Sequence, residues 1–183
     1  MTANEAKEAL ATLYDINDIM AVVPHRPPFL LVDRVVALEP WKSLSAYKNV
    51  TIGEDFFRGH FPGTPVMPGV LVLEAMAQTA MLLLNFSFRD HRDLAPPDIS
   101  ERIAGKEKEG GGDGDGDGDG DLGVRIAYFA SCDRVKFRRP VVPGDRLDLE
   151  ASFVRSGGRL WKVAGRARVQ GQRTAEAEMT ATF

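Results

Sequence analysis

Hydrophobic and polar residues repeat with two different periods along the chain. Segments that alternate between the two kinds, or that form short apolar runs bounded by turn residues, predict strands. Such segments occupy residues 30–38, 43–52, 124–139, 146–155, 159–170 and 173–183. A run of 17 mostly apolar residues, 70–86, is too long for a strand and predicts a helix from about Pro68 to Phe86. A short helix over residues 16–23 is expected between an N-cap at Asp15 and a stop at Pro24.

The order of these elements predicts an α+β fold with one buried helix. Short turns join the last three strands and indicate an antiparallel meander. A sheet with one apolar face, wrapped over the single very apolar helix, accommodates all of these elements. Because the chain has 183 residues, we expect one domain over 1–183, with a tail at 1–13. Prolines, charges and a Gly-Asp repeat predict a long, mobile, low-complexity surface insertion at 89–123.

The composition is that of an ordinary soluble protein, with 44% apolar and 27% charged residues. The long apolar run is short for a transmembrane span and contains Glu74 and Gln78, which argues against membrane insertion. The amino-terminal residues resemble neither a secretory signal nor a transit peptide, so we expect a cytoplasmic protein. The one cysteine, Cys132, fits a reducing compartment and is interpreted as an inert core thiol.

The net charge of −3 is unevenly distributed. Residues 101–123 contain eight acidic and three basic residues, a local charge of −5 that leaves +2 for the rest of the chain. A mildly basic body suits an acidic partner, whereas nucleic-acid binding needs a denser basic stripe with interleaved aromatic residues. The Gly-Asp repeat lacks the glutamate that closes an EF-hand loop, and the spacing of His25, His60 and His91 matches no zinc pattern. We therefore predict no metal site and interpret His25 as a structural residue of a turn.

The segment "RGHFPGTPVMPGVLVLEAMAQ", residues 58–78, places His60 in a loop with three prolines. A histidine has a pKa of about 6.5 and is the usual proton-transfer group at neutral pH. Taken alone, such a histidine is more often structural or merely exposed. The prolines favour the catalytic interpretation, because they stiffen the loop and a catalytic base must be held in position.

Glu74 lies inside the apolar run, where an unpaired carboxylate is costly. Desolvation favours its protonated form, which suits a general acid, and Gln78 one turn later could orient it. The alternative is a buried glutamate satisfied by the backbone or by an arginine. The N–H groups of Gly69 and Val70 are expected to point out of the helix N-terminus and to polarise a carbonyl oxygen. A base, an acid and oxyanion donors together describe proton abstraction beside a carbonyl with loss of a β leaving group, which is a dehydration.

Four segments resemble a known enzyme family. The segments "PHRPPFLLVDRV", "KNVT", "GHFPGTPVMPGVLVLEAMAQ" and "YFASCDRVKFRRPVVPGD" are similar to those of the FabZ type of bacterial 3-hydroxyacyl-acyl-carrier-protein dehydratase, over roughly residues 14–86 and 124–180. The resemblance implies a hot-dog fold, a long helix wrapped by an antiparallel sheet. It also implies a homodimer or a trimer of dimers, with each active site at a dimer interface.

The resemblance assigns roles to individual residues in the dehydration of a (3R)-3-hydroxyacyl thioester to a trans-2-enoyl thioester. His60 takes the C2 proton, Glu74 of the partner subunit protonates the departing hydroxyl, and Gly69 N–H holds the thioester carbonyl. No metal or redox cofactor is implied, and the substrate arrives on acyl carrier protein, an acidic partner. Related dehydratase-isomerases carry Asp at the acid position, so Glu74 favours a dehydratase without isomerase activity.

Some positions depart from the family or leave alternatives open. Met81 stands where the family commonly has glycine and could narrow the acyl tunnel. Candidate docking charges for the carrier protein are Arg134, Lys136, Arg138 and Arg139, although basic residues at strand ends are more often solvated surface. The two alternatives to a dehydratase are a hot-dog thioesterase, which would not require His60, and a non-catalytic acyl-thioester-binding relative, in which His60 or Glu74 would be lost.

Overall fold

The computed structural model describes residues 13–96, 99–100, 128–157 and 160–182. Along the chain its helices and strands are α2 (Ile16–Val22), β1 (Arg34–Glu39), β2 (Ser43–Asn49), the 3-10 turn η1 (Asp55–Arg58), α3 (Gly69–Asp90), the 3-10 turn η2 (Arg92–Leu94), β3 (Tyr128–Phe137), β4 (Arg146–Gly157), β5 (Leu160–Val169) and β6 (Gln172–Thr182). In this part of the chain the strands form one antiparallel sheet in the order β1-β2-β4-β5-β6-β3. The predicted meander is confirmed as β4-β5-β6, and β3 lies beyond it at one edge.

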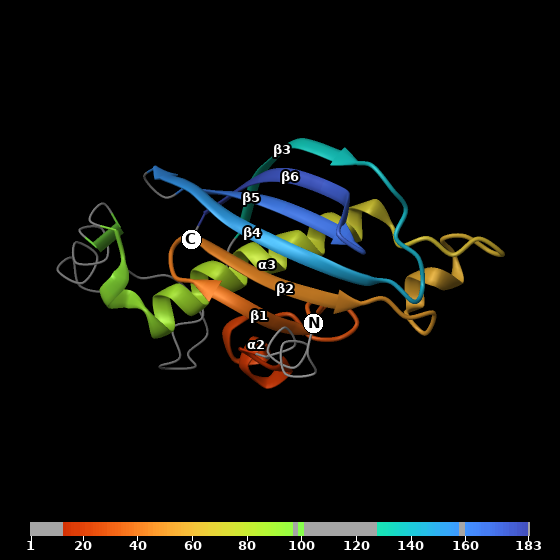
Figure 1. Ribbon diagram of the computed structural model, residues 1–183, viewed down its shortest axis with the longest axis horizontal. Helices are drawn as coiled ribbons and strands as arrows, with labels where there is room; N and C mark the ends of the chain where they lie inside the picture. Colours follow the sequence, from red (N-terminus) through yellow and green to blue (C-terminus); the bar gives the residue numbers. More distant parts are fainter. Residues whose placement is uncertain (1–12, 97–98, 101–127, 158–159, 183) are drawn as a thin grey trace, which may run out of the picture.

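The apolar helix α3 runs along one face of the sheet, as Figure 1 shows. Its residues Met76, Leu82, Leu83 and Phe86 are fully buried. The helix approaches β5 closely at Gly165, where an added Cβ would lie only 3.1 Å from the Cβ of Met76. By length and composition α3 is apolar enough to cross a membrane, but 72% of its most apolar window is buried inside the protein. It is therefore the core helix that the sequence predicts.

The short helix α2 begins as predicted. The Asp15 side chain accepts hydrogen bonds from the N–H groups of Asn17 and Asp18, and the Asp18 side chain accepts one from the Asp15 N–H. This reciprocal capping box satisfies N–H groups that have no partner within the helix. Just before α2, the ring of Tyr14 stacks on Phe86 with centroids 3.7 Å apart, which fixes the N-terminal segment against α3.

The helix α3 is longer than predicted and continues to Asp90. The expected insertion at 89–123 therefore begins too early, because its first residues are helical and Ile99 is buried beside Trp41, Leu84 and Trp161. Residues 101–123 of that segment lie outside the described residues, as do residues 1–12 of the expected tail. Both tryptophans thus pack in a second, smaller hydrophobic cluster.

The first strand is shorter than predicted and starts at Arg34 rather than near Leu30. Asp33 still donates its N–H to the Tyr47 carbonyl of β2, but residues 29–31 are held by α3 instead of by a neighbouring strand. The Leu31 N–H donates to the Gln78 side chain at 2.8 Å, and the Phe29 carbonyl accepts from the same side chain at 2.7 Å. A buried amide of the helix thus replaces the strand ladder in this segment, and it brings residues 25–31 beside Glu74.

Candidate active site

Glu74 lies on α3 and is held by a hydrogen-bond network centred on Gln78. The Gln78 Nε2 donates to Glu74 Oε1 at 2.9 Å and to the Phe29 carbonyl at 2.7 Å. The Gln78 Oε1 accepts from Leu31 N at 2.8 Å. Both ends of the amide are therefore hydrogen-bonded, which fixes the orientation of the Gln78 side chain. The predicted contact between Gln78 and Glu74 is therefore present. The Glu74 side chain is 18% exposed, which gives a fixed carboxyl group that solvent and substrate can reach.

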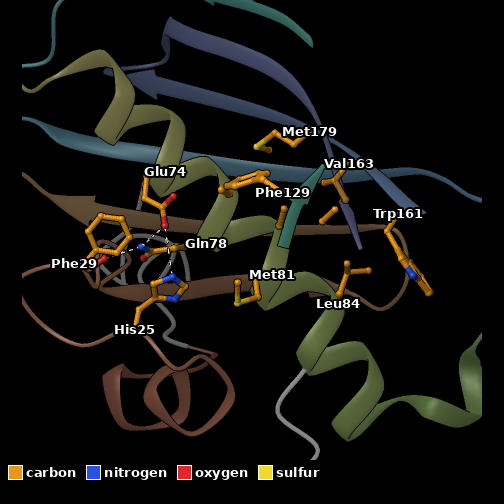
Figure 2. A pocket seen from close by; sticks show the side chains of 13 residues that line it. His25, Phe29, Glu74, Gln78, Met81, Leu84, Phe129, Trp161, Val163 and Met179 are labelled. Carbon is orange, nitrogen blue, oxygen red and sulfur yellow. Dashed lines mark hydrogen bonds and ion pairs between the residues drawn. The ribbon is translucent and has the colours of Figure 1, made fainter. Parts of the chain in front are cut away.

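A cavity of about 150 Å³ opens beside Glu74, and Figure 2 shows the side chains that line it. Glu74, Gln78 and His25 supply its polar groups at one end. The remaining lining residues are Phe29, Ala77, Ala80, Met81, Leu84, Phe129, Trp161, Val163, Met179 and Ala181. A mostly apolar cavity with a few convergent polar groups at one end suits a ligand with an apolar chain and a reactive head.

His25 is a member of this site that sequence reasoning missed. Its Nε2 lies 3.7 Å from Glu74 Oε1, its ring packs on Phe29 with centroids 5.7 Å apart, and its Nδ1 is buried without a hydrogen-bond partner among the described residues. The interpretation of His25 as a purely structural turn residue is incomplete, because the loop that carries it folds back onto α3. The sequence contains one indication of this role, because His25 lies in "PHRPPF", a segment with three prolines like the loop of His60.

His60 lies in a loop that is held by backbone hydrogen bonds between its own residues. The Phe61 N–H donates to the Thr64 carbonyl, the Thr64 N–H donates back to Phe61, and the Val66 N–H donates to the His60 carbonyl at 3.0 Å. The His60 Nδ1 lies 2.7 Å from the Val66 carbonyl oxygen. Because a carbonyl only accepts, Nδ1 carries the hydrogen and the lone pair of the neutral ring is on Nε2. This tautomer presents Nε2 as a base.

Gly69 is the first residue of α3 and lies in the same cavity as His60. The amide N–H groups of Gly69 and Val70 have no acceptor within the helix, because they belong to its first turn. Glycine lets the ring of Phe137 pack closely here, since an added Cβ would lie 3.1 Å from that ring. The cavity holds about 330 Å³ and also contacts Val66, Val72, Arg139 and Thr174. His60 and the helix N-terminus thus face one space.

The structure does not bring His60 and Glu74 of one chain together. The two residues line different cavities that have no lining residue in common. Gly69 and Glu74 are five residues apart on α3, which places them about 140° apart around the helix axis at ~100° per residue. The strand β3 reaches both cavities, with Phe129 in the cavity of Glu74 and Phe137 in the cavity of His60. The two cavities are therefore reached by opposite ends of this edge strand.

Two sequence interpretations need correction. Cys132 is exposed rather than a core thiol, because β3 has no neighbour on its outer side within the described residues. Partial desolvation by the surrounding side chains raises the pKa of its thiol, with smaller contributions from the Asp133 and Glu74 carboxylates. His91 caps the end of α3 instead of belonging to an insertion. Across the described ranges, no group of three His, Cys, Asp or Glu side chains is placed to hold a metal ion.

Three of the four candidate docking charges form ion pairs on the sheet. Arg134 pairs with Glu178, while Lys136 and Arg138 approach Glu176. These contacts hold the pKa of both glutamates below the usual range, chiefly through hydrogen bonds from Arg138 to Glu176 and from Lys162 to Glu178. Arg138 and Arg139 both line the cavity of His60, and Arg139 differs from the other three in having no ion pair within the described residues.

The fold and the two cavities define a class of protein that the comparisons also identify. A family described as the FabA-like domain matches residues 23–100, and the thioesterase superfamily matches residues 110–176. Among solved structures, the dehydratase heterocomplex ApeI:P from Xenorhabdus doucetiae aligns at a TM-score of 0.59 with 12% identity, covering 90% of this chain and 89% of that chain. The PaaI protein of E. coli aligns at 0.52 with 13% identity, covering 81% of each. This is the hot-dog fold.

The chain belongs to the FabZ family of 3-hydroxyacyl-[acyl-carrier-protein] dehydratases. The relative from Anaeromyxobacter sp. (strain Fw109-5) that carries this name is 46% identical over 176 residues, which are 96% of this chain and 94% of that protein. The relative from Thiobacillus denitrificans is 46% identical, covering 92% of this chain and 97% of its own length. The relative from Geotalea uraniireducens is 44% identical, with 92% and 96% covered. The family and fold expected from the sequence are both confirmed.

Proposed function

We propose that the protein is a hydro-lyase that removes water from a (3R)-3-hydroxyacyl chain on acyl carrier protein and forms the trans-2-enoyl thioester in bacterial fatty-acid synthesis. The observation that carries this proposal is the Gln78-held carboxyl group of Glu74 at the mouth of an apolar cavity. Such a cavity accepts the apolar acyl chain. The Glu74 carboxyl group then lies beside C3 and its hydroxyl, near the thioester. Membership of the FabZ family supports the same reaction.

In the proposed reaction, each group handles one atom of the substrate. The Nε2 of His60 takes the proton from C2, and the electron pair that remains forms the C2–C3 double bond. The carbonyl oxygen of the thioester accepts hydrogen bonds from the Gly69 and Val70 N–H groups, which stabilise its developing negative charge. The Glu74 carboxyl group donates its proton to the hydroxyl on C3, and water leaves. Gln78 orients Glu74 throughout.

The proposed acid comes from the partner subunit of a homodimer. Support for this arrangement is the separation of His60 and Glu74 within one chain and the exposure of β3, whose Phe129 and Phe137 side chains are 49% and 53% exposed. A twofold axis through the middle of two paired β3 strands would bring the Phe137 end of one copy beside the Phe129 end of the other. His60 of one subunit would then face Glu74 of the partner subunit. A trimer of such dimers is a further expectation from the family.

The proposed partner is an acidic acyl carrier protein in the cytoplasm. Arg139 is the best placed of the four basic candidates, because it lines the cavity of His60 and no ion pair to it occurs in the described part of the chain. Arg134 and Arg138 are already paired with glutamates, which lowers their value for a new acidic partner.

The experiment is to follow the conjugated double bond of the enoyl thioester by its absorbance. Crotonyl-carrier protein is hydrated by the purified protein, and His60→Ala should lower the rate by about 10²- to 10⁴-fold, the usual share of one general acid–base group. His91→Ala is the matched control, since that histidine lies at the end of α3 away from both cavities. Unchanged hydration in His60→Ala would falsify the mechanism. Release of free carrier-protein thiol together with crotonate would instead identify a thioesterase, and formation of neither the 3-hydroxy thioester nor free thiol would indicate a non-catalytic protein.

A further inference from the structure

The cavity beside Glu74 has a polar end and an apolar end, and both ends can be assigned to named residues. Figure 2 shows Glu74, Gln78 and His25 at one end, Trp161 and Leu84 at the other, and Met81 between them. The polar lining is confined to the first end. An acyl chain that enters beside Glu74 must therefore extend toward Trp161, because the apolar lining continues only in that direction.

The helix α3 sets the scale of this cavity. Glu74, Gln78 and Met81 follow one another at spacings of four and three residues, which places them on one face of the helix. At a rise of ~1.5 Å per residue, Met81 lies about 10 Å and Leu84 about 15 Å along the axis from Glu74. With C–C bonds of about 1.5 Å at tetrahedral angles, an extended chain advances ~1.3 Å per carbon, so about eight carbons beyond C3 reach the level of Met81.

The far wall of the cavity is rigid. Trp161 is only 5% exposed and packs against Phe88 and Phe153, with ring centroids 5.6 and 5.8 Å away. Trp41 lies behind it at 6.3 Å and is fixed in turn by a hydrogen bond from its indole N–H to the His91 carbonyl. A ring held on three sides cannot turn aside for a longer ligand. Met81 and Met179 line the cavity and each has three rotatable side-chain bonds, and Met81 is the one that α3 places between Glu74 and Trp161.

We propose that Met81 and Trp161 limit the substrates of this protein to acyl chains of about ten carbons or fewer. The proposal rests on the proposed function and names the substrate class within it. A dry cavity of about 150 Å³ accommodates a six-carbon molecule, and the path to Met81 accommodates about eight carbons beyond C3. With the three carbons of the reacting centre added, the cavity volume and the path length each give a total chain length of about ten carbons. Met81 closes the path at this length, and the ring of Trp161 forms the wall behind it.

The test is kcat/KM for 3-hydroxyacyl-carrier proteins with chains of four to sixteen carbons. The wild-type protein should lose at least tenfold in kcat/KM between ten and fourteen carbons. Met81→Ala and Met81→Gly should restore at least tenfold at fourteen carbons, because they remove the side chain from the path. Ala80→Val, which adds volume to the lining, should move the limit toward shorter chains. Opposite shifts in the two kinds of variant cannot arise from a general loosening of the fold.

The matched control is Leu73→Ala. Leu73 lies on the same helix, is half-buried and does not line the cavity, so its truncation should leave the dependence on chain length unchanged. The proposal is overturned if the wild-type protein uses fourteen-carbon chains as well as eight-carbon chains. It is equally overturned if Met81→Ala and Met81→Gly leave the limit where it was.

A binding measurement separates this proposal from the proposed function. Saturated acyl-pantetheine thioesters cannot lose water, and calorimetry reports their affinity whether or not the protein is a dehydratase. Affinity should rise up to about ten carbons and then stop rising or fall. A limit seen in binding without any dehydration would overturn the function and keep the length limit. Dehydration with an affinity that rises through sixteen carbons would keep the function and overturn the limit.

Discussion

His60 and Glu74 line different cavities that share no lining residue, although one short segment of sequence carries both. If they act on one substrate, they must come from two subunits. We therefore predict complementation between two inactive variants. A heterodimer of His60→Ala and Glu74→Gln chains, co-expressed with different tags, contains one intact site and one doubly impaired site. Its hydration rate should be about half of the wild-type rate per dimer.

The control for this experiment is each variant purified as a homodimer, which should be nearly inactive. A heterodimer as inactive as its two parents would place both residues of the site in one chain. It would also remove the structural reason for an obligate dimer.

The second prediction concerns Gln78, whose amide group makes three hydrogen bonds at once. Gln78→Leu keeps much of the volume but leaves the Leu31 N–H and the Phe29 carbonyl without a partner, at a cost of about 1–3 kcal/mol in the free energy of unfolding. Glu74 also loses its orienting contact, so kcat should fall with it. Urea unfolding and the hydration assay measure the two effects.

Thr79→Val is the matched control for Gln78→Leu. Thr79 is the next residue of the helix and is equally buried, but its hydroxyl donates only to the Ala75 carbonyl of the same helix. Its loss should cost less stability and leave kcat unchanged. Equal losses in both variants would contradict a special role for Gln78.

The third prediction concerns stability in alkali. Burial and the hydrogen bond that Tyr14 donates to Asp90 raise the pKa of Tyr14 to about 12. In the unfolded chain this phenol loses its proton near pH 10, while the folded protein still holds it. The free energy of unfolding contributed by this contact is therefore present below pH 10 and is lost between pH 10 and about 12. Urea unfolding of the wild-type protein and Tyr14→Phe should show a pH-dependent difference in this window that disappears at its upper end.

The fourth prediction separates the Gly-Asp segment from the residues just before it. Deletion of residues 105–122 should leave activity and Tm nearly unchanged, since this Gly- and Asp-rich sequence contributes few apolar side chains to a core. Ile99→Asp should instead lower Tm strongly, because Ile99 is fully buried against Trp41, Leu84 and Trp161. Thermal unfolding of both variants measures the contrast, and a large loss on deletion would give the segment a structural role.

The core elements could be predicted from the sequence because their patterns are long and local. The apolar run of α3 and the alternation in β4, β5 and β6 are each sufficient to define the element. The end of α3 could not be predicted, because three of the four residues 87–90 are polar. Ser87 is in fact buried, donating to the Leu83 carbonyl and accepting from the Trp41 N–H. Contacts between distant segments decide where this helix ends.

The candidate site divides in the same way. Glu74 and Gln78 are one helical turn apart, so their contact follows from sequence spacing alone. His25 reaches Glu74 only because residues 29 and 31 bond to Gln78, and no local pattern shows that bond. The exposure of Cys132 depends on which strand lies at the edge of the sheet, and alternation along one strand carries no information on strand order.

The spacing of Glu74, Gln78 and Met81 on one helix has an evolutionary consequence. The proposed chemistry lies on the first two residues, and the proposed selection of substrates lies on the third, about two turns away. A single amino-acid substitution at position 81 would then alter the acyl chain lengths that the protein accepts without disturbing the reaction itself. Relatives of this protein could diversify their membranes by exchanging one residue while the catalytic groups stay constant.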